Sequence, residues 1–107
     1  MGDIFTDYTF GEAERARMDA DGHYVFPGIL TAPACAALTG ALARVERLRG
    51  ELDDRPNRFS AEYEPYLASL IAHPQLLGMA RAILGDDVRY DHCVSLNRAG
   101  GNGGIGW

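Results

Sequence analysis

The sequence predicts an α+β fold in which helices pack on a small number of strands. Two patterns indicate this fold class. Apolar residues recur at three- and four-residue steps through most of the chain before Gly85, and from Val88 the period changes to two. The composition, 47% hydrophobic and 23% charged over 107 residues, is typical of a folded protein. A chain of this length forms one domain with a modest core.

The charge balance excludes some classes of partner. The net charge is -5 and no basic cluster occurs, so we expect no nucleic-acid partner and no membrane partner. The apolar windows are too short to span a bilayer, and the amino end carries Asp3, Asp7 and Glu12 in place of a basic, then apolar, secretion signal. We therefore expect a cytoplasmic protein whose two cysteines, Cys35 and Cys93, are reduced and mostly buried.

The amino-terminal part predicts one helix and one short strand. Thr9 to Glu12 matches a capping box, so we expect a helix from Phe10 to Ala20 that ends at Asp21-Gly22. The aromatic and β-branched stretch from His23 to Phe26, cut off by Pro27-Gly28, is typical of a strand.

A second helix should follow Thr31, which serves as its cap, with Pro33 in the first turn. An apolar stripe with helical spacing marks the face expected in the core: Cys35, Leu38, Leu42, Val45, Arg49 and Leu52. The segment from Asp53 to Arg58 is polar, contains a proline and has no periodicity, and we interpret it as a surface loop.

Two shorter helices are expected next, the first around Tyr66 to Ile71. The second begins at Pro74 and ends at Gly85, with His73 as its cap. Its inward face should hold Leu76, Leu77, Ala80, Ile83 and Leu84.

The last patterned segment predicts a strand from Val88 to Asn97. Its two faces differ in character. The apolar face, expected to pack on the helices, holds Val88, Tyr90, His92, Val94 and Leu96. The small and polar face, expected to line water or a cavity, holds Arg89, Asp91, Cys93, Ser95 and Asn97.

The surrounding sequence excludes several motifs that short stretches of the chain would otherwise suggest. The run from Gly101 to Gly106 matches a dinucleotide fingerprint, but no buried strand leads into it and no helix can follow it. The neighbours His92 and Cys93 point to opposite faces of a strand, so they cannot form a catalytic dyad. The three histidines lack the spacing of metal ligands, and His92 is interpreted as a core-facing histidine with a hydrogen-bond partner. We assign no catalytic residue and no metal ligand.

The order of these pieces resembles the amino-terminal part of the phytanoyl-CoA dioxygenase family. The resemblance rests on the stretch His23 to Leu30, the helix opening Thr31-Ala32-Pro33, the stretches His73 to Leu77 and Ile83 to Val88, and Leu96-Asn97-Arg98. It implies an iron(II)- and 2-oxoglutarate-dependent oxygenase, with helices packed on strands of an incomplete double-stranded β-helix, or jelly roll. Val94 and Asn97 resemble positions of that family that can approach the 2-oxoglutarate cosubstrate. The alternative is that Val94 packs in the core and Asn97 caps the turn.

The resemblance also implies what the chain lacks. The family's first iron ligands follow a tryptophan after a variable turn, and Trp107 resembles that tryptophan. Residues 1–107 would then be the amino-terminal portion of one oxygenase domain, truncated before the iron-binding motif. We expect this chain alone to be inactive and to hold no cofactor, whereas the full-length form would hydroxylate a small organic molecule.

An alternative from another class is a small non-catalytic α+β module that binds a partner protein. Self-association through an exposed sheet edge is possible in either case, because a sheet cut from a larger one leaves backbone groups unpaired.

Overall fold

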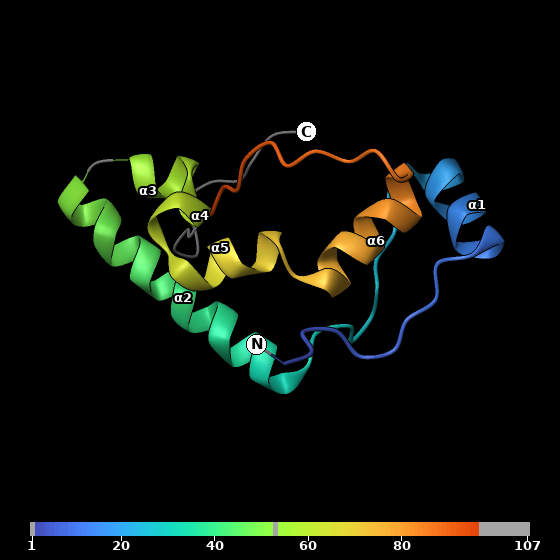
Figure 1. Cartoon of the computed structure of the whole chain (residues 1–107), viewed down its shortest axis with the longest axis horizontal. Coiled ribbons are helices and arrows are strands. Elements are labelled where there is room, and N and C mark those ends of the chain that lie inside the picture. The colour runs from blue at the N-terminus through green and yellow to red at the C-terminus, as the bar shows by residue number, and fades with distance from the viewer. Residues whose placement is uncertain (1, 53, 97–107) are drawn as a thin grey trace.

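The computed structural model describes residues 2–52 and 54–96, and these residues form helices joined by extended segments (Figure 1). The helices in chain order are α1 (Glu12–Asp21), α2 (Ala32–Leu52), α3 (Arg55–Arg58), α4 (Ser60–Tyr63), α5 (Pro65–Ile71) and α6 (Pro74–Leu84). Strand pairing within the described ranges is limited to one isolated antiparallel bridge between Phe5 and Leu30. The predicted α+β fold, with helices on strands of an incomplete jelly roll, is therefore wrong for these residues.

The helices form an elongated body with extents of 46 × 34 × 28 Å. Helix α2 runs along one side, α3 to α5 fold back beside it, and α6 continues from α5 toward α1 at the opposite end (Figure 1). After α6 an extended segment returns to α3 and α4 (Figure 1). No single helix in the described part is long and apolar enough to span a membrane. Only the α5–α6 pair, bent by 46°, meets those criteria together.

The main core lies between α2 and the helices that fold back on it. Its buried members are Ala41, Val45, Ala61 and Leu67. Val45 is only 1% exposed, which confirms its predicted core position, but Leu42 is 40% exposed and Cys35 is also exposed. The inward face of α2 is thus shifted toward its alanines. Their small side chains let the neighbouring helices approach closely, and apolar periodicity alone does not reveal this preference.

A second cluster joins the amino-terminal segment to the middle of the chain. Ile4, Phe5 and Ala34 are buried together. The Gln75 Oε1 accepts hydrogen bonds from the amides of Ile4 at 2.7 Å and Phe5 at 3.0 Å. The segment before α1 is therefore held by a side chain of α6 as well as by the single bridge to Leu30.

The predicted strand from His23 to Phe26 is extended but is not paired as a strand in the structure. Its aromatic rings pack at the edge of the molecule instead. The Tyr24 and Phe26 rings lie 4.8 Å apart between centroids, and Phe10 contacts both of them. Aromatic residues favour strands because they pack well on a pleated surface, and here ring packing is satisfied without a sheet.

Most predicted helix ends are confirmed, because they depend on local chemistry. Gly22 has φ 77° and Gly85 has φ 97°, the left-handed region that glycine accepts at a helix end. The Thr31 Oγ1 accepts from the Ala34 amide at 3.2 Å, and the His73 Nδ1 accepts from the Gln75 amide at 3.1 Å. The predicted capping box is wrong, because α1 begins at Glu12 and no side chain caps it.

Helix α1 contains no buried residue, and its attachment to α6 is polar. The Arg15 Nη2 donates to the carbonyl oxygens of Ala82 at 2.8 Å and Ile83 at 2.9 Å. These carbonyls lie in the last turn of α6, where backbone oxygens have no partner within the helix. The positive charge of a guanidinium at this end also interacts favourably with the negative end of the helix dipole.

The segment predicted as a surface loop contains α3 instead. Asp53 lies outside the described residues, but Pro56 and Asn57 are buried in α3. The prediction was wrong because Pro56 was interpreted as a helix breaker, whereas a proline in the first turn of a helix loses no hydrogen bond. The predicted helices at α5 and α6 are confirmed, although Leu84, expected in the core, is 74% exposed.

The predicted strand from Val88 onward is an extended segment without a strand neighbour in the described part, and its predicted faces are reversed over residues 92–96. Cys93 and Ser95, from the face expected to be solvated, are partly buried. Tyr90, Val94 and Leu96, from the face expected to pack on the helices, are about half exposed. The reversal follows from hydrogen bonds between this segment and the turn that joins α3 to α4.

Candidate functional site

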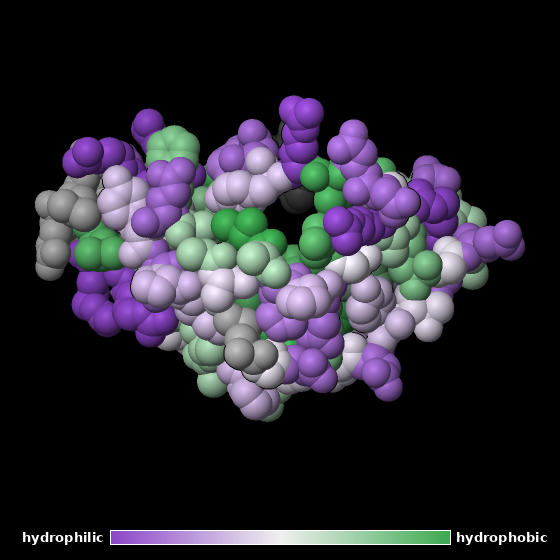
Figure 2. All heavy atoms as spheres, viewed as in Figure 1, coloured by the Kyte–Doolittle hydropathy of each residue, from purple (hydrophilic) through white to green (hydrophobic). Residues whose placement is uncertain are grey.

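An apolar groove of about 530 Å³ runs between α5, α6 and the extended segment 88–94. Leucines of both helices line one side of it, and Val88, Tyr90 and Val94 line the other side. Figure 2 shows the hollow in the space-filling view, with hydrophobic side chains gathered around it. Its size and lining are typical of ligand pockets, which measure roughly 300 to 1,000 Å³ and are mostly apolar.

The groove contains one of the two residues predicted to approach a cosubstrate. Val94 lines it and is 49% exposed, so its side chain is accessible from the groove. Asn97 lies outside the described residues, and so do the turn from Ala99 to Gly106 and Trp107. Binding of a cosubstrate at Val94 and Asn97 therefore stays a prediction.

A polar anchor holds the extended segment against α3 and α4. The Asn57 carbonyl oxygen accepts from the Ser95 amide at 2.9 Å, and the Asn57 Nδ2 donates to the Ser95 carbonyl oxygen at 3.0 Å. The Ser60 amide donates to the Cys93 carbonyl oxygen at 2.8 Å, and the Ser60 and Ser95 hydroxyls are 2.9 Å apart. Asn57 thus pairs with both backbone groups of Ser95, as a neighbouring strand would.

The buried end of this anchor has one unsatisfied group. Asn57 is 8% exposed, and its Oδ1 has no hydrogen-bond partner among the described residues. The sequence did not predict the anchor, because Asn57 and Ser95 are far apart in the chain and the segment around Asn57 was interpreted as a loop. The stretch Asp54-Arg55-Pro56 could have indicated the start of a helix here, because an acidic residue is followed by a proline in the first helical turn.

The polar residues at the rim of the groove point mostly to solvent. His92, predicted to face the core, is instead exposed, and its Nδ1 lies 2.5 Å from the Asp91 Oδ2. Partial burial raises the pKa of the Tyr90 hydroxyl, and the nearby Cys93 and Glu62 side chains add to this rise. Cys35 and Cys93 are free, as predicted, but Cys35 is exposed and Cys93 is only partly buried.

The described residues do not fit an iron site. They contain no group of three or more histidine, cysteine, aspartate or glutamate side chains placed to hold a metal ion. Non-haem iron in oxygenases needs two histidines and a carboxylate on one side of the metal. The arrangement around Val94 can therefore form an apolar wall, but residues 2–52 and 54–96 cannot supply the metal centre.

Comparisons of this chain with protein-family models, with curated proteins and with solved structures find no match. The resemblance to the phytanoyl-CoA dioxygenase family rests on the sequence elements alone and stays a prediction.

Proposed function

We propose that this chain is the helical amino-terminal part of an iron(II)- and 2-oxoglutarate-dependent oxygenase, similar to the phytanoyl-CoA dioxygenase family. In this proposal the chain supplies a scaffold and one apolar wall, and the metal ligands come from outside the described residues. A small organic substrate would be oxidised only by the full-length form.

The observation that carries the proposal is the half-exposed apolar face of the extended segment. One edge of this segment is anchored by Asn57 and Ser60. Tyr90, Val94 and Leu96 on it are about half exposed, and Tyr90 and Val94 also border the groove. Exposed apolar side chains gathered beside an apolar groove are typical of a surface that another layer of protein covers.

The proposal is tested first on the coding DNA. Reading the DNA downstream of the Trp107 codon should give His-x-Asp or His-x-Glu in one of the three frames, with a further histidine and an arginine later in that frame. Absence of such residues from every frame would overturn the proposal.

A second test uses the purified chain with ferrous ion and 2-oxoglutarate. We expect no succinate, because the described residues do not fit a metal centre. The matched reaction uses the longer polypeptide encoded by the downstream frame, which should form succinate. Stoichiometric iron binding and 2-oxoglutarate consumption by the 107-residue chain itself would contradict the assignment of a scaffold role.

A second candidate function is a non-catalytic module that associates with another protein, including a second copy of this chain. The same groove favours it, since the groove is open and bordered by exposed Leu84 and Tyr90. Light scattering after size-exclusion chromatography tests whether this module associates with a second copy of the chain. A monomer at all concentrations argues against self-association, whereas a dimer that Val94→Asp dissociates would support it.

A further inference from the structure

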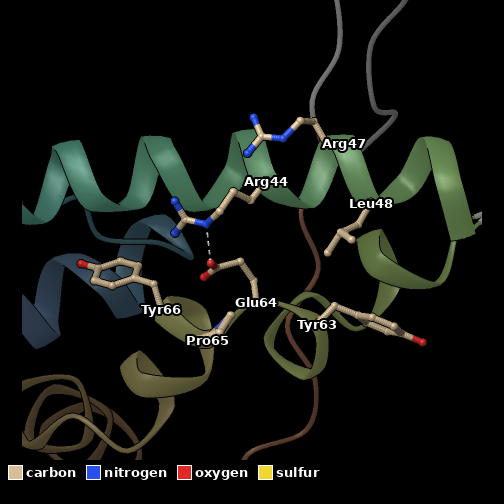
Figure 3. Close-up of a pocket in the computed structure, with 7 residues that line it drawn as sticks. All are labelled: Arg44, Arg47, Leu48, Tyr63, Glu64, Pro65 and Tyr66. Carbon is tan, nitrogen blue, oxygen red and sulfur yellow. Dashed lines mark hydrogen bonds and ion pairs between the residues drawn. The ribbon is translucent and has the colours of Figure 1, made fainter.

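A second pocket, of about 670 Å³, lies between α2 and the junction of α4 with α5, and it differs in character from the apolar groove. Two arginines and Leu48 line it from α2, and the junction contributes residues 63–66 (Figure 3). The lining combines positive charge, one carboxylate and two tyrosine rings. Pockets of this kind bind ligands through a few polar groups placed among apolar ones.

The guanidinium of Arg44 is held in one orientation. Its Nε donates to the Glu64 Oε1 at 2.7 Å, while the Glu64 Oε2 accepts from the Leu67 amide at 3.0 Å. The Glu64 side chain is only 3% exposed, so the backbone of α5 fixes the carboxylate and the carboxylate fixes the arginine. The two terminal nitrogens of Arg44 have no hydrogen-bond partner among the described residues, and a ligand can use their N–H groups.

Gly40 provides the space for this orientation. A Cβ built at Gly40 would lie 3.3 Å from the Arg44 Nη1, which is tighter than most real contacts of a Cβ. Gly40 lies one helical turn before Arg44 on α2, so the guanidinium extends back over the glycine. A glycine inside a helix is unfavourable by roughly 0.5 to 1 kcal/mol relative to alanine.

Arg47 lies three residues after Arg44 and lines the same pocket. Figure 3 shows its side chain turning back along α2 toward Arg44. Within the described ranges Arg47 has no ion pair and no hydrogen bond, whereas the nearby Arg49 is paired with Glu46 and Asp54. The two guanidinium charges less the Glu64 carboxylate leave one uncompensated positive charge in this pocket, on a chain whose net charge is -5.

We propose that this pocket binds a small monocarboxylate with an apolar or aromatic body. The ligand carboxylate accepts hydrogen bonds from Arg44 and Arg47, whose planar guanidinium groups match its geometry. The body of the ligand lies against Leu48 and Pro65, between the Tyr63 and Tyr66 side chains, whose rings extend to opposite sides (Figure 3). A single negative charge matches the single uncompensated positive charge, whereas a dianion would add a surplus charge near Glu64.

The test titrates the full chain with benzoate by nuclear magnetic resonance, with benzamide as the matched neutral ligand and inorganic phosphate as a second anion. Benzoate should bind saturably, with chemical-shift changes at the amides of Arg47 and Tyr66. Benzamide and phosphate should bind at least tenfold more weakly, because one lacks the charge and the other lacks the apolar body.

Two variants assign the binding to this pocket. Arg47→Gln should weaken benzoate binding roughly tenfold, the expected cost of losing a charge-assisted hydrogen bond. Its melting temperature should stay unchanged, because Arg47 is exposed and has no internal partner in the described part. Arg17→Gln on the exposed face of α1 removes the same charge elsewhere and should bind benzoate as the wild type does.

Three results would each overturn the assignment. These are equal binding of benzoate and benzamide, tighter binding of phosphate than of benzoate, and equal losses of affinity in the Arg47 and Arg17 variants. None of them bears on the oxygenase proposal, because this pocket is separate from the groove that contains Val94.

Discussion

The Arg44 Nε donates a 2.7 Å hydrogen bond to the Glu64 Oε1, and this bond joins the middle of α2 to the residue that precedes α5. Burial by itself raises the pKa of the Glu64 carboxyl. The hydrogen bonds from Arg44 and from the Leu67 amide lower it by more, and the pKa lies below its ordinary value of 4.5. Glu64 is therefore charged at neutral pH although its side chain is buried.

The first prediction follows from this lowered pKa. A carboxyl whose pKa is lower in the folded state stabilises the fold above its ordinary pKa and loses that contribution as the pH falls through the folded value. Glu64→Gln should reduce the free energy of unfolding by about 1 to 2 kcal/mol at pH 7, because the amide is a weaker partner for Arg44. The difference in the free energy of unfolding between the wild type and Glu64→Gln should narrow as the pH falls below 4.5. Urea unfolding of both proteins measures this difference.

Glu62→Gln is the matched control for this experiment. Glu62 lies two residues earlier on α4, is exposed, and makes no hydrogen bond or ion pair through its side chain in the described part. Its substitution should leave the free energy of unfolding within about 0.5 kcal/mol at each pH. A gap between the wild type and Glu64→Gln that stays constant from pH 7 to pH 3 would contradict the role given to Glu64.

The second prediction separates the two possible inward faces of α2. Val45→Ala should lower the free energy of unfolding by about 1 to 3 kcal/mol, because Val45 is almost fully buried in the main core. Leu42→Ala removes more atoms but from an exposed position, and should cost under about 1 kcal/mol. Thermal and urea unfolding measure both values, and a larger loss at Leu42 would place the other face of α2 in the core.

The features that the sequence predicted correctly are those determined by neighbouring residues. Helix α6 begins at Pro74 and ends before Gly85, as predicted, because the backbone restrictions of proline and glycine act over a few positions. Val94 lies on an extended segment, but the strand predicted there does not form in the described part of the chain.

The features that the sequence did not predict depend on distant residues. Alternation from Val88 onward cannot tell whether a second strand lies beside the segment, and here Asn57 takes that place. The bond between Arg44 and Glu64 joins a residue of α2 to the residue before α5, 20 positions later, so no local pattern indicates it. The predicted faces were reversed over residues 92–96 because hydrogen bonds at Ser95 outweighed the burial of Val94.

The third prediction concerns the amino-terminal segment. Gln75→Met keeps the length of the side chain but removes the acceptor for the amides of Ile4 and Phe5. Two amides beside a buried cluster would lose their partner, so we expect a loss of about 2 kcal/mol in the free energy of unfolding. Hydrogen exchange should quicken at Ile4 and Phe5 before it changes at Val45. Unchanged exchange at both amides would show that Gln75 does not hold this segment.

The last prediction tests the anchor of the extended segment. Asn57→Ala removes the Nδ2 donor to the Ser95 carbonyl oxygen, and also the unsatisfied Oδ1, so the loss should be only about 1 kcal/mol. Asn57→Asp keeps the shape but places a carboxylate oxygen against the Ser95 carbonyl oxygen. Because the site is buried, we expect a larger loss of about 3 kcal/mol at pH 7.

The acidic variant should recover part of its stability at low pH, since a protonated carboxyl can donate a hydrogen bond to the Ser95 carbonyl oxygen. Hydrogen exchange at the Ser95 amide reports the release of the segment directly, and it should quicken more in Asn57→Asp than in Asn57→Ala. If both variants lost the same stability and exchanged equally at Ser95, the segment would be held by Ser60 and by apolar contacts of Cys93 rather than by the Asn57 side chain.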